Sequence, residues 1–92
     1  MIDCETYQTN MAETPFSATG NELSVDMRWV RDPIEPHSAG EELVAVIEGA
    51  GRLTCEGEVY ELSRGQGVLI PNAAERSWDF EAPALLYRVA LK

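Results

Sequence analysis

The sequence predicts an all-β domain built from short antiparallel strands. Apolar and polar residues alternate with a period of two over residues 23–30, and further short apolar segments follow at regular intervals. Turn signals rich in glycine or proline separate these segments, and no segment has the length and 3.6-residue period of an amphipathic helix. Many short strands with evenly spaced turns are typical of a β-sandwich or a β-barrel.

Residues 1–20 follow neither period, and we expect an irregular N-terminal arm with at most one short edge strand, available for a dimer contact. The barrel domain is expected over residues 21–92. Its first strand covers residues 23–30, where Leu23, Val25, Met27 and Trp29 predict one buried face. Two prolines within residues 32–36 predict a loop after this strand, because proline lacks a backbone donor and restricts the residue before it.

The later segments predict a series of short strands joined by tight turns. An apolar run over residues 43–47 ends at glycines, and short strands are expected at 52–55 and 59–62 across a turn centred on Gly57. Further strands are expected at 68–70, 76–80 and 85–91. Two hairpin turns in close succession indicate antiparallel pairing.

Size and charge restrict the partners. A chain of 92 residues is long enough for one domain but buries a small core, so we expect a homodimer. Acidic residues outnumber basic ones by 16 to 7, for a net charge of −9, which disfavours nucleic acid. No apolar run approaches the roughly 20 residues that cross a bilayer, so no membrane partner is expected.

Two cysteines, Cys4 and Cys55, are distant in sequence and form no zinc motif. The start of the chain has no basic region followed by an apolar stretch, so no export signal is visible. We therefore expect a cytoplasmic protein with two reduced thiols, although a disulfide between them would be open to it in an oxidising compartment.

The residues from Glu35 to Gly49 carry a recognisable motif: Glu-Pro-His-Ser-Ala-Gly-Glu-Glu, then Leu-Val-Ala-Val-Ile-Glu-Gly. This stretch resembles the first motif of the cupin family, which reads His-x-His, a short gap, Glu, six residues and Gly. Glu42 takes the place of the motif glutamate, and His37 that of the second histidine. Glu35 stands where the first histidine usually lies.

The second cupin motif reads Gly, five residues, then Pro-x-Gly-x-x-His, and residues 65–76 are similar to it. Gly65 and Pro71 match at the correct separation. Ala73 replaces the second glycine, and Arg76 replaces the histidine. The resemblance covers residues from about 23 to the end. It implies a small single-domain cupin with a jelly-roll barrel, altered at two of the family's four metal positions.

The resemblance directs Glu35, His37, Glu42 and Arg76 toward one point inside the barrel, and Trp78 shares the face of Arg76 because it lies two residues further along. A guanidinium has no free lone pair, so Arg76 cannot bind a metal. It can place a fixed positive charge near Glu42 instead. Each residue also has a plain structural reading: a solvated carboxylate, a loop histidine, an exposed arginine or a core tryptophan.

Three hypotheses for function follow. The favoured one is a small-molecule-binding cupin without a metal cofactor that holds a small polar or anionic ligand in the barrel, through Arg76 and His37. The alternative is a metal-dependent cupin enzyme of the dioxygenase, isomerase or lyase type. Its ligands would be Glu35, His37 and Glu42, and its metal manganese, iron, nickel or zinc. The third is a sensor or structural cupin whose dimer surface is the functional part.

Overall fold

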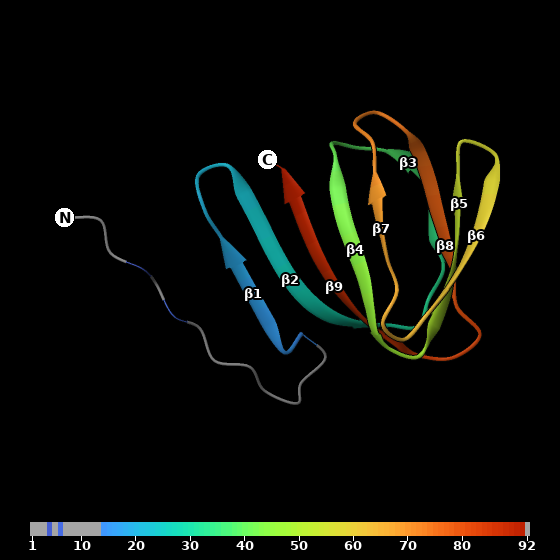
Figure 1. Cartoon of the computed structure of the whole chain (residues 1–92), viewed down its shortest axis with the longest axis horizontal. Helices are drawn as coiled ribbons and strands as arrows, with labels where there is room; N and C mark the ends of the chain where they lie inside the picture. The colour runs from blue at the N-terminus through green and yellow to red at the C-terminus, as the bar shows by residue number, and fades with distance from the viewer. Residues whose placement is uncertain (1–3, 5, 7–13, 92) are drawn as a thin grey trace.

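A computed structural model describes Cys4, Thr6 and residues 14–91, and every element in these residues is a β-strand (Figure 1). The strands are β1 (Phe16–Thr19), β2 (Leu23–Val30), β3 (Ile34–Ser38), β4 (Glu42–Glu48), β5 (Ala50–Cys55), β6 (Glu58–Ser63), β7 (Gly67–Ile70), β8 (Glu75–Asp79) and β9 (Ala84–Leu91). Within this part of the chain there is no helix that could span a membrane.

The strands form two antiparallel sheets. One has five strands in the order β1-β2-β9-β4-β7, and the other has four in the order β3-β8-β5-β6. From β2 to β5 the chain changes sheet at every connection, and Figure 1 shows the four-stranded sheet facing the β9, β4 and β7 side of its partner. The β1-β2 hairpin continues the larger sheet beyond the barrel. The predicted all-β jelly-roll fold is confirmed.

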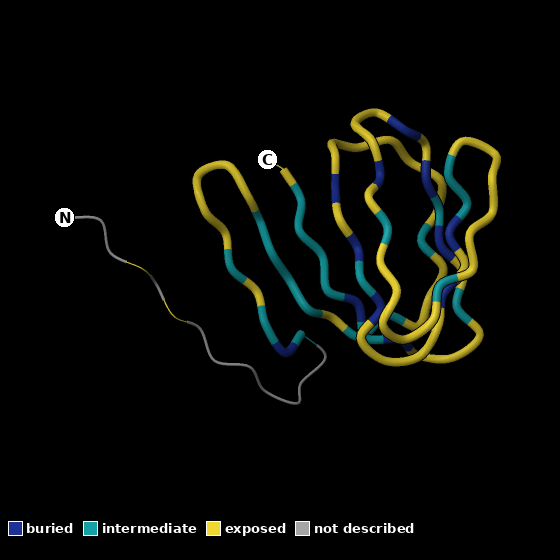
Figure 2. The backbone as a smooth tube through the Cα atoms, in the orientation of Figure 1, coloured by how far each residue is buried: buried dark blue, intermediate teal, exposed yellow. Residues whose placement is uncertain are grey.

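The hydrophobic core lies between the two sheets. The larger sheet contributes Val44, Val46, Ile70 and Leu86, and the smaller sheet contributes Leu53. Burial in Figure 2 concentrates where the sheets overlap, whereas the β1-β2 hairpin carries half-buried and exposed residues. The barrel is therefore the packed unit, and the hairpin is a sheet extension.

The alternation predicted for residues 23–30 is present, but its apolar face points away from the core. Val44 of the core lies opposite Arg88, which in turn lies opposite Asp26, so these three residues share the inner face. Residues on either side of Asp26, such as Val25 and Met27, therefore lie on the outer face. The expectation that this face is buried in the chain's own core was wrong.

Residues 34–38 form strand β3, where a loop was expected. Among the described strands, β3 lies at a sheet edge and pairs only with β8, and its register shifts between Ile34 and His37. Pro36 lies inside that shift. An edge position with an irregular register tolerates proline, because no ladder hydrogen bond is required from its nitrogen.

Two turns place a residue other than glycine at positive φ. Glu56 and Gly57, with φ of 48° and 82°, form the two-residue turn of the β5-β6 hairpin, a geometry that suits the twist of the flanking strands. Ala73, with φ of 67°, lies in the β7-β8 connection. This is the position at which the cupin motif has glycine, the residue that adopts such angles without strain.

The N-terminal arm is described only in part. A short strand, β1, does occur there, and it pairs with β2 of the same chain. Residues 1–3, 5 and 7–13 lie outside the described residues, so the arm's expected contact with a second copy stays a prediction. Cys4 is exposed, Cys55 is half-buried, and both are free thiols.

Candidate functional site

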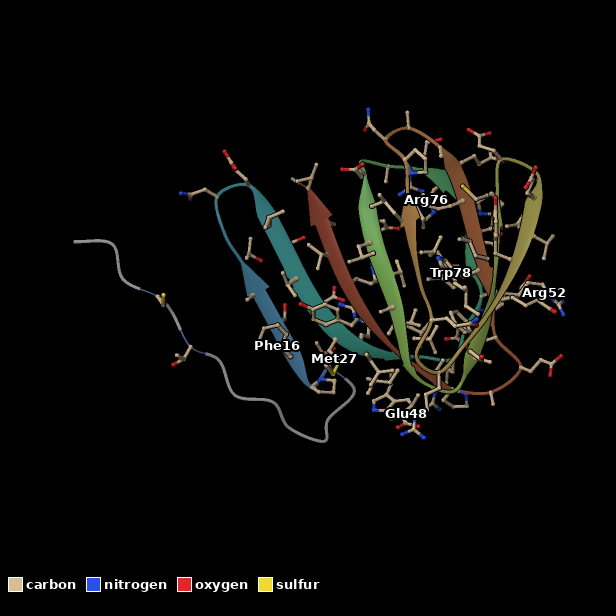
Figure 3. The ribbon with its side chains drawn as sticks, viewed as in Figure 1. Phe16, Met27, Glu48, Arg52, Arg76 and Trp78 are labelled. Carbon is tan, nitrogen blue, oxygen red and sulfur yellow. The ribbon has the colours of Figure 1, made fainter. Side chains whose placement is uncertain are left out.

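The two sequence motifs meet where β3, β4 and β8 come together. β3 carries Glu35 and His37, β4 begins at Glu42, and β8 carries Arg76. Pairing of β3 with β8 places His37 directly opposite Arg76. Figure 3 shows Arg76 and Trp78 between the two sheets, one above the other along β8.

The Arg76 side chain is fully buried and bonded to backbone. Its Nε donates to the carbonyl of Ala74 at 3.0 Å, and its Nη1 donates to the carbonyl of Gly40 at 2.9 Å. Its Nη2 donates to the carbonyls of Ala39 at 3.2 Å and Pro71 at 3.0 Å. These acceptors belong to the β3-β4 and β7-β8 connections, so the guanidinium joins two loops.

Glu42 supplies the fifth partner of Arg76. The Arg76 Nη1 lies 3.3 Å from the Glu42 Oε1, and both side chains are buried, with exposures of 0% and 8%. Four of the guanidinium N–H groups donate to the four carbonyls, and the contact with Glu42 is an ion pair at the same Nη1 that bonds Gly40. The predicted proximity of Arg76 to Glu42 is confirmed. A ligand could reach Arg76 only by displacing one of these internal acceptors.

Glu42 also binds a second arginine. The Arg88 Nη2 donates to the Glu42 Oε2 at 3.2 Å, and the Arg88 side chain is one-third exposed. Asp26 lies opposite Arg88 on β2, and its Oδ1 has no hydrogen-bond partner among the described residues. Glu42 thus pairs with two guanidiniums, one from each sheet, and Asp26 lies in register with Arg88.

Glu35 and His37 lie on the outside of this cluster. Both side chains are exposed on the edge strand β3, and the His37 Nδ1 is 2.9 Å from the carbonyl oxygen of Glu35. That separation requires a proton on Nδ1, which then donates to the carbonyl. The structure thus brings His37 near Arg76 in register but leaves its ring in contact with solvent.

Trp78 belongs to the core. It is 3% exposed, and its ring stacks parallel to that of Phe80, with centroids 5.9 Å apart. Gly51 makes room for this pair, since a Cβ there would lie 2.7 Å from the Phe80 ring. Of the five site residues expected from the sequence, Glu42, Arg76 and Trp78 are buried together, while Glu35 and His37 are exposed.

The residues at the family's metal position do not fit a divalent ion. Glu42 has both oxygens engaged by guanidiniums, and a further positive charge there would be repelled by Arg76 and Arg88. Throughout residues 14–91, no three His, Cys, Asp or Glu side chains converge in a way that would hold a metal.

Arg88 was missed by the sequence analysis. It shares a face of β9 with Leu86, which is fully buried, and with Ala90. An arginine on the core-facing side of an otherwise apolar strand is the signal that could have identified it, because a buried charge requires a partner.

A cleft adjoins the arginine cluster between the free edges of the two sheets, at β6 and β7. It has a volume of about 460 Å³. The residues around it are Cys55, Glu56, Glu58, Tyr60, Val68, Leu69, Ile70, Pro71 and Ala74. Cys55 lies opposite Arg76 across the β5-β8 pair, and Pro71 and Ala74 are two of the residues whose carbonyls Arg76 binds.

One wall of the cleft is polar and acidic. Cys55 lies opposite Glu58 in the β5-β6 hairpin, and Tyr60 lies opposite the buried Leu53, so all three face inward. The Tyr60 hydroxyl donates to the Glu58 Oε2 at 3.2 Å. This hydrogen bond, together with the negative charge of Glu58, raises the pKa of Tyr60 above its usual value.

A second cavity, of about 490 Å³, lies at the opposite end of the smaller sheet. Its charged lining consists of Glu61, Asp79, Glu81 and Arg52. Arg52 donates to Glu61 at 3.0 Å, and this bond and the charge of Glu61 raise the pKa of Arg52. The cavity shares no lining residue with the cluster formed from the two motifs.

The family follows from a direct comparison with family models. The cupin domain model matches residues 23–87, which include both motifs and most of the barrel. The chain belongs to the cupin family. A search of curated protein sequences gives no match.

Solved structures share this cupin's fold at low sequence identity. A cupin protein from Bacteroides fragilis aligns with a TM-score of 0.80 and 17% identity, over 100% of this chain and 86% of that one. A conserved protein of unknown function from Streptococcus pyogenes aligns with a TM-score of 0.75 and 20% identity, over 86% and 70%.

An enzyme is also among the structural neighbours of this cupin. A salicylate 1,2-dioxygenase from Pseudaminobacter salicylatoxidans aligns with a TM-score of 0.68 and 24% identity, over 75% of this chain but only 21% of that one. At such identities the likeness establishes the barrel alone. The chemistry has to be argued from this chain's own side chains.

Proposed function

We propose that this cupin is a metal-independent small-molecule-binding protein, and that its ligand lies in the cleft between β6 and β7. The observation that carries the proposal is the complete internal bonding of Arg76. With five partners in place, Arg76 forms a fixed part of the barrel interior, and the open space next to it becomes the site for a ligand. A volume of about 460 Å³ is within the range of small-molecule sites.

The lining favours a neutral or cationic polar ligand over an anion. Val68 and Ile70 offer an apolar wall, while Glu58 and Glu56 add negative charge on the other side. A ligand hydroxyl or amine could donate to Glu58 while its apolar part packs on Val68. The proposal therefore keeps the small polar ligand expected from the sequence, but the ligand is neutral or cationic instead of anionic.

The metal-dependent alternative receives less support. Glu35, His37 and Glu42 would need to converge on manganese, iron, nickel or zinc, yet two of them are exposed on β3 and Glu42 is bound to two arginines. We propose no metal-dependent reaction for this chain. The cytoplasm remains the expected compartment, in keeping with two free thiols.

The ligand class is tested by titrating the isotope-labelled full-length protein with phenethylamine, 2-phenylethanol and phenylacetate, and recording amide spectra. These probes share an aromatic body and differ in charge. We expect shifts at Cys55, Tyr60, Ile70 and Ala74, with phenethylamine the strongest binder and phenylacetate the weakest. Glu58→Gln should weaken phenethylamine about threefold or more, since a charge-assisted hydrogen bond is lost.

Glu61→Gln provides the matched control, because Glu61 lies on the same strand and faces away from the cleft. It should leave phenethylamine binding unchanged. If phenylacetate bound most strongly and shifted His37 and Arg76, the ligand site would be the pocket expected from the sequence. If no probe shifted residues of the cleft, the proposal would be refuted. Stoichiometric binding of manganese, iron(II), nickel or zinc would favour the enzyme alternative.

A further inference from the structure

The cleft between β6 and β7 is bordered by two free sheet edges. β6 is the last strand of the smaller sheet, and β7 is the last strand of the larger one. A turn joins them, in which the Gln66 N–H donates to the Ser63 carbonyl at 3.0 Å, and Figure 1 shows the two strands diverging from this turn. Within residues 14–91, no other strand pairs with the edges that border the cleft.

The pairing pattern shows which backbone groups β6 presents at its free edge. The β5-β6 turn has two residues, so Glu58 belongs to its closing hydrogen-bonded pair, and such pairs alternate with non-bonded ones along the hairpin. The N–H and C=O groups of Val59 and Glu61 therefore point away from β5. Ser63 has the same orientation, and its N–H donates to the Gln66 Oε1 at 2.8 Å. No corresponding bond is present at Val59 or Glu61 within residues 14–91.

The β7 edge has the same character. The Val46 N–H donates to the Gln66 carbonyl at 2.8 Å, so the alternation directs the backbone groups of Gly67 and Leu69 away from β4. Leu69 and Val59, one on each edge, are 62% and 58% exposed, more than any other large apolar residue that the structure describes. Edges with unpaired backbone groups and exposed apolar side chains are templates for an added strand.

We propose that the occupant of the cleft is an extended cationic peptide, which adds a strand antiparallel to β6 and fills the gap between the two sheets. This inference rests on the proposed function, because it uses the same cleft and the same acidic wall. Alternate side chains of a strand point to opposite faces. Those that point inward meet Glu58 and Tyr60, which favours lysine or arginine. Those that point outward lie between Val59 and Leu69, which favours apolar residues.

A peptide satisfies groups that a small amine leaves unpaired. An amine would bind Glu58, but the backbone groups of Val59 and Glu61 would still be bonded to water alone, whereas a peptide main chain pairs with them. β6 has six residues and spans about 20 Å, and five extended residues are about 17 Å long. The net charge of −9, with Glu56 and Glu58 at the cleft, attracts a cationic peptide and repels an acidic one.

Titration of the isotope-labelled full-length protein with acetyl-Val-Lys-Val-Lys-Val-amide tests the proposal. We expect amide shifts and slower amide exchange at Val59 and Glu61, because their N–H groups become bonded to the peptide. The same peptide N-methylated at its valines should bind about tenfold more weakly or worse, since its main-chain donors to β6 are lost. Replacing its lysines by glutamates should weaken binding by a similar factor.

Val59→Pro tests the pairing in the protein itself. Proline is tolerated at a strand edge where the N–H faces solvent, so the barrel should fold, as circular dichroism would show, but the donor at this position is lost. Val59→Ala is the matched control, because it removes the side chain and keeps the N–H. The peptide should bind Val59→Pro about threefold more weakly, or worse, than Val59→Ala. Equal affinities for the two variants would overturn the proposal.

Phenethylamine separates this inference from the proposed function, because it carries no main-chain groups. If it bound in the cleft while the N-methylated peptide bound as tightly as the parent peptide, strand addition would be refuted and the proposed function would stand. If neither phenethylamine nor the peptide bound, both would fail. Slow amide exchange at Val59 and Glu61 without peptide, lost on dilution, would identify a second copy as the occupant and would also overturn the proposal.

Discussion

Arg76 occupies the position at which the cupin motif has a histidine, and the two side chains differ in what they can bind. An imidazole offers one lone pair to a metal, whereas a guanidinium offers five donors and no acceptor. In this chain Arg76 donates to the Ala39, Gly40, Pro71 and Ala74 carbonyls and forms an ion pair with Glu42. The residue therefore holds two loops in place, a task that a bound metal could also perform.

Arg76→Met is expected to lower the free energy of unfolding by about 3–5 kcal/mol, because it leaves Glu42 and several carbonyls without their partner. Urea denaturation followed by circular dichroism measures this loss. Adding Glu42→Gln to the same chain should recover part of it, since no buried carboxylate then remains beside the gap. Arg64→Met, at an exposed pair with Glu48 of 3.7 Å, should change stability by under about 0.5 kcal/mol. Equal losses of unfolding free energy for Arg76→Met and Arg64→Met would contradict this account.

Tyr60 gives a prediction on pH dependence. Its hydrogen bond to Glu58 raises its pKa above the usual 10.0, so the folded protein holds the phenol proton to higher pH than the unfolded chain does. The stabilisation is complete below pH 10.0 and is lost as pH rises through the folded-state pKa. Glu58→Gln should lower the pKa of Tyr60, and NMR titration of its ring carbons measures the change. If Glu61→Gln lowered the pKa of Tyr60 by the same amount, the shift would come from the overall negative charge of the strand and not from the hydrogen bond to Glu58.

At the level of single residues, the site could be predicted only in part from the sequence. Motif spacing placed Arg76 near Glu42, and the ion pair is present. The four carbonyl bonds could not be foreseen, because they depend on the backbone path of two loops that carry no distinctive side chains. Arg88 was missed for a different reason: its strand looked uniformly apolar, and the sequence did not show which of its faces was the inner one.

Among the elements, β3 and the β7-β8 connection depart most from what their sequences suggest. Two prolines within residues 32–36 indicated a loop, and the edge position of β3 explains why a strand forms there. In the β7-β8 connection an alanine adopts the left-handed conformation for which the family uses glycine. This backbone carries strain, because a Cβ in that region lies too close to the neighbouring carbonyl.

Ala73→Gly is therefore expected to stabilise the protein. Left-handed backbone costs a non-glycine residue about 1–2 kcal/mol, and the added flexibility of glycine in the unfolded chain offsets roughly half of that gain. A net gain of about 0.5–1 kcal/mol should raise the Tm by several degrees. Differential scanning calorimetry provides the measurement. Ala82→Gly, at an exposed residue without positive φ, should give no gain, and a gain of the same size there would refute the strain explanation.

For the whole molecule, turn spacing and the cupin resemblance predicted the fold correctly, while the side of the sheet that faces the core was not predicted. A period of two establishes that Val25 and Met27 share a face, but it cannot tell whether the chain's own core or another surface covers that face. The answer depended on β9, whose pairing with both β2 and β4 fixes the inner side.

The arginine cluster also bears on how this barrel can change over evolutionary time. Histidine at position 76 alone would strip partners from the Ala39, Gly40 and Pro71 carbonyls, and Arg88 would still occupy Glu42. Substitutions at position 76 are thus constrained: metal binding there requires concerted changes, with less stable intermediates between them. Variants of this chain should tolerate changes at the rim of the cleft more readily than at position 76.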